Sequence, residues 1–336
     1  MAGPEQDERG GPPSGAPGIG PDEPVVIVTG AAGNLGRRLT RRLHRDYGVV
    51  GIDRRPFPNR PKDVALEQID IRRNRAENVF RRYAGRIQAV FHTGILHDMR
   101  KPASEHYSFN LVGTTQVLNF CVRYKVPKFV FLSSANVYGP HPHNAQFLTE
   151  DAPLRGSEGF PMIRDLVAVD HAVSSFLWKR PEIDTVILRP VHIVGAVKNA
   201  PSNYLRLRYV PTLLGFDPMV QIIHVEDVVD AMVLAARPGA RGIFNLTGPG
   251  EVPLSAILKE LGKVRVPVPH PLAKPLLRFL WNSRLTTFPE PELDHIRFIC
   301  MVDGGRAREV LGFAPKRTLR ETIHAAVEAG PLAVPR

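Results

Sequence analysis

Short apolar runs alternate along the chain with longer segments of helical periodicity. The run PVVIVT at 24–29 precedes a glycine-rich turn, after which Leu35, Leu39 and Leu43 are spaced as on one face of a helix. Further strands are expected at 47–53, 64–70, 89–92, 128–133, 185–188 and 242–246, and helices near 105–124, 161–179 and 225–236. Strands that are separated by helices and lack strict alternation predict an α/β fold with a doubly wound parallel sheet.

The same pattern divides the chain into a core and a smaller lobe. Residues 24–190 carry the alternation of strand and helix, and 222–247 complete this core with one more helix and strand. Residues 191–221 and 248–336 are rich in Pro, Lys and Arg, and we expect them to form a C-terminal substrate lobe at the edge of the sheet. Residues 1–23 lack an apolar segment, which predicts a disordered tail rather than a signal peptide.

Composition excludes several classes of protein. With 336 residues, of which 43% are hydrophobic, the chain can form a globular core, and no apolar run reaches the roughly 18 residues of a membrane span. Cys121 and Cys300 are too far apart in the sequence for a metal or redox motif, which favours a reducing, cytoplasmic location. His141 and His143 lack a third ligand at suitable spacing, so we expect no metal site.

The formal net charge of +11 raises the question of acidic partners. Residues 72–86 hold six arginines and one acid, and we interpret them as the solvated face of a helix. Recognition of nucleic acid needs basic and aromatic residues that converge on a groove, so no nucleic-acid partner is expected. Residues 270–284 mix Leu, Phe and Trp with Lys and Arg. We interpret them as a helix packed on the core, with peripheral membrane contact as the alternative.

Three glycines stand between the first strand and the first helix. Gly30, Gly33 and Gly36 are spaced three residues apart, as in turns that bind a dinucleotide. One glycine permits the tight turn, one lets the backbone approach a pyrophosphate, and one allows the helix to pack closely on the strand. The helix then begins at Asn34 and Leu35, whose amide groups can bind phosphate. The turn therefore predicts a Rossmann fold that binds a dinucleotide.

The end of the second strand bears on the choice of cofactor. Asp53 lies about 20 residues beyond the glycines, where a carboxylate can accept hydrogen bonds from a ribose 2′-hydroxyl. This position favours NAD, because the carboxylate would repel a 2′-phosphate. Arg54 and Arg55 follow at once and could neutralise such a phosphate. We expect NAD, and NADP stays open.

Several motifs follow the glycine turn in a recognisable order. They are TGAAGNLG at 29–36, IDIR at 69–72, FHTG at 91–94, NLVGTTQVL from Asn110, FVFLSSANVYG at 129–139, ILRPVHIVG from Ile187, HVEDVVDAM from His224 and FNLTG from Phe244. Together they resemble the extended short-chain dehydrogenase/reductase superfamily, most closely the NAD-dependent epimerases/dehydratases of the UDP-galactose 4-epimerase type. The resemblance covers about residues 24–250.

The resemblance implies further cofactor-binding positions and a partner. It places Asp70 next to the adenine, with Ile71 beside it. It also implies that the loop after the fourth strand passes over the cofactor. The remaining positions implied are His92, Thr93, Gly94, Asn110, Ser133 and Pro190. A homodimer formed through a helix pair of the core is implied as well.

At the catalytic centre this sequence departs from the pattern it resembles. Members of the family use a Ser or Thr, a Tyr, and a Lys four residues after the Tyr, whose charge lowers the tyrosine pKa. Ser134 matches the serine, but the Tyr and Lys positions fall on Met162 and Leu166, which cannot titrate. Asp165 and His192 are the candidate replacements for the missing base.

Two functions stay open on the sequence. The first is an NAD(P)-binding oxidoreductase of the epimerase/dehydratase type with altered or reduced catalysis, in which Ser134, Asp165 and His192 act on a nucleotide-sugar or another small hydroxyl or carbonyl substrate. The second is a non-catalytic dinucleotide-binding protein that acts as a cofactor sensor or scaffold. We expect the enzyme, because the sequence resembles an enzyme superfamily.

Overall fold

The core of the molecule is a seven-stranded parallel sheet. The computed structural model describes residues 19–98, 100–159, 163–197, 199–283, 286, 290, 293–294, 297–298, 300–328 and 330. Strand order is β10-β6-β5-β4-β1-β2-β3, with every neighbouring pair parallel. The strands are β1 (Val25–Thr29), β2 (Gly48–Ile52), β3 (Ala65–Glu67), β4 (Ile87–His92), β5 (Lys128–Leu132), β6 (Asp184–Pro190) and β10 (Gly242–Leu246). The predicted doubly wound fold is confirmed, and its order reverses between β1 and β4, where such sheets bind ligands.

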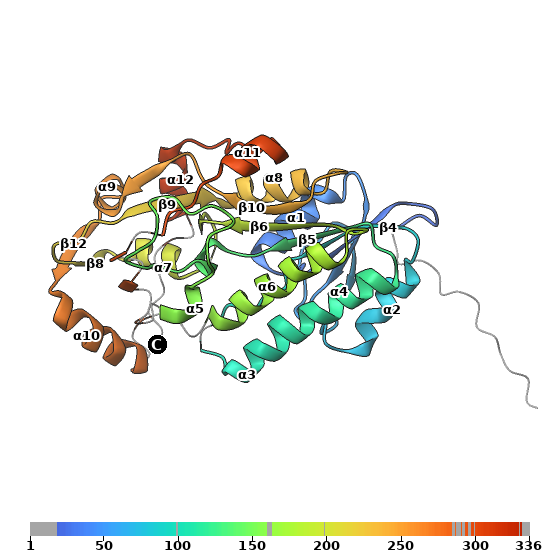
Figure 1. Cartoon of the computed structure of the whole chain (residues 1–336), viewed down its shortest axis with the longest axis horizontal. Coiled ribbons are helices and arrows are strands. Elements are labelled where there is room, and N and C mark those ends of the chain that lie inside the picture. Colours follow the sequence, from blue (N-terminus) through green and yellow to red (C-terminus); the bar gives the residue numbers. More distant parts are fainter. Residues whose placement is uncertain are drawn as a thin grey trace, which may run out of the picture.

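Helices cover both faces of this sheet (Figure 1). One face packs against α1 (Asn34–Leu43), α8 (Val225–Ala235) and α11 (Gly305–Leu311). The other packs against α2 (Asn74–Arg82), α4 (Gly113–Arg123) and most of α6 (Arg164–Lys179). The helix expected over 105–124 is divided, because α3 (Ala103–His106) and the π-helix η1 (Tyr107–Val112) precede α4. No helix in the described part of the chain is both long and apolar enough to span a bilayer.

The lobe has small sheets and a core of its own. β7 (His192–Val194), β9 (Met219–His224) and β11 (Glu251–Pro253) form one sheet, and β8 (Tyr209–Leu213) and β12 (Val264–Val268) form another. The lobe helices are α7 (Ala200–Arg206), α9 (Leu254–Glu260), α10 (His270–Asn282) and α12 (Leu319–Ala325). Their buried side chains form a cluster separate from the two clusters that line the large sheet.

Two segments differ from the expected division of the chain. Residues 19–23, expected to belong to the tail, are docked on the core: Ile19 is buried, and the Arg86 guanidinium donates to the carbonyl oxygens of Gly20 and Glu23. Residues 300–313, expected in the lobe, include α11 and Phe313, which pack on the large sheet. In both cases apolar side chains distant in the sequence gain burial on the core, which composition alone does not reveal.

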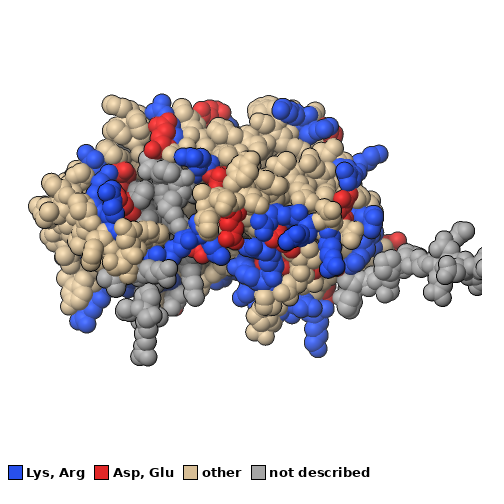
Figure 2. Space-filling view, turned by 90° about the horizontal axis from the view of Figure 1, so that it is seen from below, with Lys and Arg blue, Asp and Glu red and all other residues tan. Residues whose placement is uncertain are grey.

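The Arg-rich segment behaves as its composition suggested. It forms α2, which buries Ala76, Val79 and Phe80 and leaves Arg75, Arg81 and Arg82 exposed. The surface seen from below carries many basic side chains over the core, while the end of the molecule occupied by the lobe shows few charged side chains (Figure 2).

Candidate functional site

The glycine turn closes tightly at two of its three glycines. Gly30 has a φ of 73°, and a Cβ there would lie 2.7 Å from the Cα of Gly94. A Cβ on Gly36 would lie 2.1 Å from the carbonyl oxygen of Gly30. A Cβ on Gly33 would lie 3.0 Å from the same oxygen, and the φ of Gly33 is −70°. Gly30 and Gly36 are therefore required by the fold, whereas a Cβ on Gly33 would be crowded less severely, by the Gly30 oxygen and the Arg55 guanidinium.

The start of α1 is well suited to an anion. Gly33 is its N-cap, no side chain of the described residues caps it, and its first turn contains no acid. The amides of Asn34, Leu35 and Gly36 belong to the first turn and have no acceptor within the helix, so they present partial positive charge. A diphosphate fits such a turn without further partners.

Asp53 holds the glycine turn in place. Its carboxylate is 7% exposed and accepts a hydrogen bond of 3.0 Å from the amide of Ala32. It also accepts from the amide of Arg55 at 2.9 Å and from the Arg55 guanidinium at 3.1 and 3.2 Å. A ribose hydroxyl bound here would therefore share the carboxylate with Arg55.

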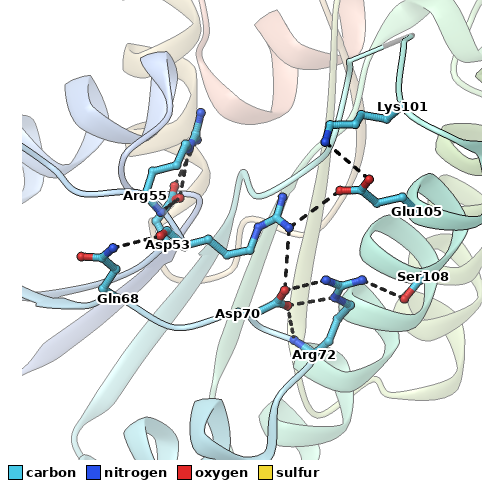
Figure 3. Close-up of polar contacts among 9 residues, drawn as sticks. Asp53, Arg55, Gln68, Asp70, Arg72, Lys101, Glu105 and Ser108 are labelled. Atoms are coloured by element: carbon cyan, nitrogen blue, oxygen red, sulfur yellow. Dashed lines mark hydrogen bonds and ion pairs between the residues drawn. The ribbon is translucent and has the colours of Figure 1, made fainter.

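A cluster of charged side chains borders Asp70, among them Arg72 and Glu105 (Figure 3). The Arg54 guanidinium lies 4.5 Å from the ring centre of Phe109 and 3.9 Å from the carboxylates of Asp70 and Glu105. Arg72 donates to both Asp70 oxygens, at 3.0 and 2.6 Å. Burial acts to raise the pKa of Asp70, but the hydrogen bonds from Arg72 outweigh it and hold the pKa below its usual value. Asp70 is thus a carboxylate already paired with Arg72.

Three residues predicted to bind the cofactor have side chains that are buried or hydrogen-bonded within the protein itself. Ile71 is buried in the core. His92 is fully buried, with Nδ1 2.6 Å from the Thr29 hydroxyl and Nε2 2.9 Å from the Thr114 hydroxyl. Asn110 accepts from the amide of Leu96 at 2.7 Å and donates to its carbonyl at 3.0 Å. The His92 and Asn110 side chains therefore brace the loop that carries Gly94 and are not free to reach a ligand.

The Thr93 side chain is also engaged, since its hydroxyl donates to the carbonyl oxygen of Thr29 at 2.8 Å. This bond joins the end of β1 to the loop after β4. The two loops that flank the switch point of the sheet are thereby held together, with Gly94 against Gly30. The backbone of Gly30 and Gly94 therefore borders the candidate site.

A buried polar network lies behind the site, and sequence reasoning missed it. The Ser133 hydroxyl donates to Asp170 at 2.6 Å, and the Arg189 guanidinium donates to both Asp170 oxygens at 3.0 and 2.6 Å. Arg189 also donates to the Tyr138 hydroxyl at 2.8 Å, which in turn donates to Asn245 at 2.7 Å. Burial raises the pKa of Tyr138 to about 12, so this tyrosine stays protonated at neutral pH.

The network accounts for two more predicted positions. The Ser133 side chain belongs to the network rather than to an open surface. Pro190 is buried at the end of β6 and pairs in register with Leu246 of β10. The signal that could have found the network is the pair of chargeable residues, Asp170 and Arg189, placed in otherwise apolar segments.

The three candidate catalytic residues occupy different surroundings. Ser134 is half-buried and accepts a hydrogen bond of 3.2 Å from the amide of Asn136. Asp165 lies in the first turn of α6, where burial raises its pKa and the charge of His106 opposes this. Leu166, which follows it, is packed in the core, and Met162 lies outside the described residues.

His192 faces a pocket between core and lobe. The pocket is lined by Ala135, Asn136, Val191, His192, Met219, Val220, Gln221, Phe298 and Cys300. Burial lowers the pKa of His192 to about 4 and raises that of Cys300 to about 12, so both are neutral at pH 7. The segments after β5 and β6 supply one wall, and β9 of the lobe supplies another. The pocket therefore lies at the same carboxyl edge of the sheet as the glycine turn.

Comparison with known proteins agrees with this geometry. The model of the NAD dependent epimerase/dehydratase family matches residues 26–247, from β1 to the residue after β10. The chain belongs to this family. The match spans the whole large sheet and the strands that pass into the lobe, so family membership rests on the core rather than on the glycine turn alone.

Proteins similar in sequence include an uncharacterized protein and a UDP-glucose 4-epimerase. An uncharacterized protein of Mycobacterium tuberculosis is 30% identical over 89% of this chain and 82% of its own length. The UDP-glucose 4-epimerase of Dictyostelium discoideum is 29% identical over 60% of this chain and 64% of its own.

Solved structures show the same fold. The UDP-glucose 4-epimerase of Thermus thermophilus in complex with NAD is 22% identical, covers 91% of this chain and 98% of its own, and has a TM-score of 0.69. MoeE5 in complex with UDP-glucose and NAD is 23% identical, covers 90% and 97%, and has a TM-score of 0.68.

Proposed function

We propose that this epimerase/dehydratase family member binds NAD(H) at the glycine turn and acts as an oxidoreductase on a nucleotide-sugar or another small hydroxyl or carbonyl substrate. The observation that carries the proposal is the uncapped, acid-free start of α1 directly beyond Gly30, at the switch point of the sheet. The similar structures of MoeE5 with UDP-glucose and NAD and of the Thermus thermophilus UDP-glucose 4-epimerase with NAD support the choice of ligands. The cytoplasmic location expected from the sequence remains part of this proposal.

Different residues of the chain would bind different parts of the dinucleotide. The amides of Asn34, Leu35 and Gly36 would hold the diphosphate, Asp53 would accept hydrogen bonds from ribose hydroxyls, and Asp70 would contact the adenine. When bound, the nicotinamide accepts or returns a hydride. The pocket lined by His192 then receives the substrate at the same edge of the sheet.

Proton transfer is where this chain departs from the family pattern. Ser134 would hydrogen-bond the reacting oxygen, and Asp165 or His192 would accept a proton in place of a tyrosine phenolate. The pKa of His192 at about 4 leaves the imidazole neutral but makes it a weak base. Loss of a well-matched base typically costs roughly 10²- to 10⁴-fold in rate, so we expect weak or absent epimerisation of UDP-galactose.

A second candidate function is favoured by Leu166. This side chain is buried in the core at the position where the sequence resemblance expects a lysine. A protein with an intact dinucleotide site and no base would bind the cofactor and report its presence to a partner. Binding of NAD(H) without reduction or oxidation by any of a panel of sugars and alcohols would favour this function.

The test is calorimetric titration of the purified chain with NAD⁺, NADH, NADP⁺ and NADPH. We expect NAD(H) to bind more tightly than NADP(H), because the Asp53 carboxylate repels a 2′-phosphate. Gly33→Arg should abolish binding and lower the melting temperature less than Gly36→Ala does, because Gly33 has an ordinary φ and a Cβ there is less crowded than one on Gly36. Arg75→Gln, on the exposed side of α2, is the control and should retain NAD binding.

Two outcomes would contradict the proposal. Tighter binding of NADP(H) would assign Arg54 and Arg55 to a 2′-phosphate and reverse the cofactor preference. Equal affinity of the native chain and Gly33→Arg for NAD(H) would show that the dinucleotide does not bind at the glycine turn. Turnover, followed by absorbance of the reduced cofactor, should disappear in Ser134→Ala if the chain is an enzyme.

A further inference from the structure

Helix α10 exposes an apolar stripe at the outer end of the lobe. It buries Ala273 and packs Leu277 against the lobe core, but Leu272, Leu276 and Phe279 are 61%, 48% and 63% exposed. These three positions are spaced i, i+4 and i+7, so they form one stripe along the helix. A helix of a globular domain normally turns its apolar face inward, and a contiguous exposed stripe marks an interaction surface.

The sheet of β8 and β12 extends this stripe. In their parallel register Val264 pairs with Tyr209 and Val266 with Pro211, which puts these four side chains on one face. Tyr209 is 59% exposed, Val264 49% and Val266 40%. The outward face of this small sheet is therefore apolar and open to solvent.

The strand face and the helix stripe are joined. Leu214 and Phe216, which follow β8, are 59% and 36% exposed. The amide of Leu214 donates to the carbonyl of Val268 at 3.0 Å, and the ring of Phe216 lies 6.3 Å from that of His270, the first residue of α10. Figure 1 shows β8, β12 and α10 together at the end of the molecule that is far from α2 and α4. We call this combined area the lobe-end surface.

The segments that form the lobe-end surface carry charged residues of one sign, although two of these pair with acids from a later segment. Segments 207–216 and 263–282 contain five basic residues and no Asp or Glu. Two of the five, Lys274 and Arg278, pair with the carboxylates of Asp294 and Glu290. The other three are Arg208, Lys263 and Arg265, and within the described residues none of them has an ion pair.

Exposed leucine and aromatic side chains flanked by Arg and Lys are the composition of interfacial membrane-binding elements. We propose that the lobe-end surface docks on the headgroup region of a bilayer that contains anionic phospholipid. The apolar side chains reach the boundary of the acyl chains, and the arginines and lysines lie among the phosphates. This inference is independent of the cofactor and of catalysis.

Vesicle flotation of the full chain tests the proposal. We expect co-flotation with vesicles of phosphatidylcholine and phosphatidylglycerol, and much less with phosphatidylcholine alone. The triple variant Leu272→Ser/Leu276→Ser/Phe279→Ser should bind at least about tenfold more weakly, because binding scales with buried apolar area. The matched control is Val310→Ser, since Val310 is 58% exposed on α11 and should bind as the native chain does.

The charge contribution has its own test. Arg208→Gln/Arg265→Gln should weaken binding to the anionic vesicles by about fivefold per arginine, since one basic residue near such a surface contributes about 1 kcal/mol. Binding to phosphatidylcholine alone should not change.

Three results would overturn the proposal. The first is no co-flotation of the native chain with either vesicle. The second is a triple variant, shown to be folded by its circular dichroism, that floats as well as native. The third is self-association of the native chain that the triple variant loses, without flotation, because the lobe-end surface would then be a contact between copies of the protein.

Discussion

The buried histidine of β4 shows how a single residue can be chemically conspicuous and yet serve the fold. His92 was a candidate cofactor residue on the basis of resemblance. Its two ring nitrogens lie within hydrogen-bond distance of the Thr29 and Thr114 hydroxyls, and it has no exposed surface. Burial lowers its pKa to about 3, so it is neutral in the folded protein at any physiological pH.

This neutrality predicts a dependence of stability on pH. In the unfolded chain the histidine titrates near 6.5, whereas in the folded protein it does so near 3, so protons bind the unfolded chain preferentially between these values. The stability that His92 contributes is complete above about pH 6.5 and declines as the pH falls toward 3, by about 1.4 kcal/mol per pH unit.

The measurement is the free energy of unfolding by urea at about pH 7 and pH 5 for native chain and His92→Gln. Native protein should lose about 2 kcal/mol more than the variant over this interval. His192 and His224, whose pKa values are also lowered by burial, are present in both proteins and cancel in the difference. An identical loss in both proteins would contradict the assignment.

At the scale of elements, the pair Asp170–Arg189 joins α6 to β6, and through Ser133 to the end of β5. Both side chains are almost completely buried, at 0% and 2% exposure. A buried ion pair that loses one partner leaves an uncompensated charge, which costs about 3–5 kcal/mol. We expect Asp170→Asn to lower the free energy of unfolding by roughly this amount.

Urea denaturation followed by circular dichroism measures this change. The control is Glu67→Gln, which removes the partner of Arg82 at the surface, where such a pair contributes about 0–1 kcal/mol. If both variants lower the free energy of unfolding by the same small amount, the buried network does not hold the carboxyl ends of β5, β6 and β10 together.

The elements also show where sequence reasoning succeeds. β1, the glycine turn and α1 are encoded locally: an apolar run, glycines at fixed spacing, and leucines at helical spacing are enough to place them. β10 was predicted with its observed bounds, Gly242–Leu246, for the same reason. The cofactor edge of the sheet follows from these pieces, because parallel strands place their carboxyl ends together.

Other features depend on contacts between distant segments. β7, β8, β9 and β12 are short, and the prolines in β8 and β12 weaken the strand pattern. Their pairings join residues far apart in the sequence, as β8 does with β12. The roles of Ser133, His92 and Asn110 depend on Asp170, Thr114 and Leu96, which only folding brings near.

For the whole molecule, the face formed by α4 and α6 offers a surface for a second copy of the chain. The two helices run along the same side of the large sheet (Figure 1). Trp178 on α6 is 76% exposed, and Tyr107 and Val112 of η1 are 53% and 44% exposed. The sequence resemblance implies a homodimer through a helix pair of the core, and these exposed apolar side chains lie on helices of the core.

We therefore expect the native chain to form a dimer of twice its 37.3 kDa, and Trp178→Glu to be a monomer. A charge placed in an apolar interface must be desolvated without a partner, which disfavours association strongly. Size-exclusion chromatography with light scattering gives the masses, and Val310→Glu is the control with a charge on another face. A dimer that persists in Trp178→Glu would move the interface elsewhere, and a native monomer at tens of micromolar would show that α4 and α6 face solvent.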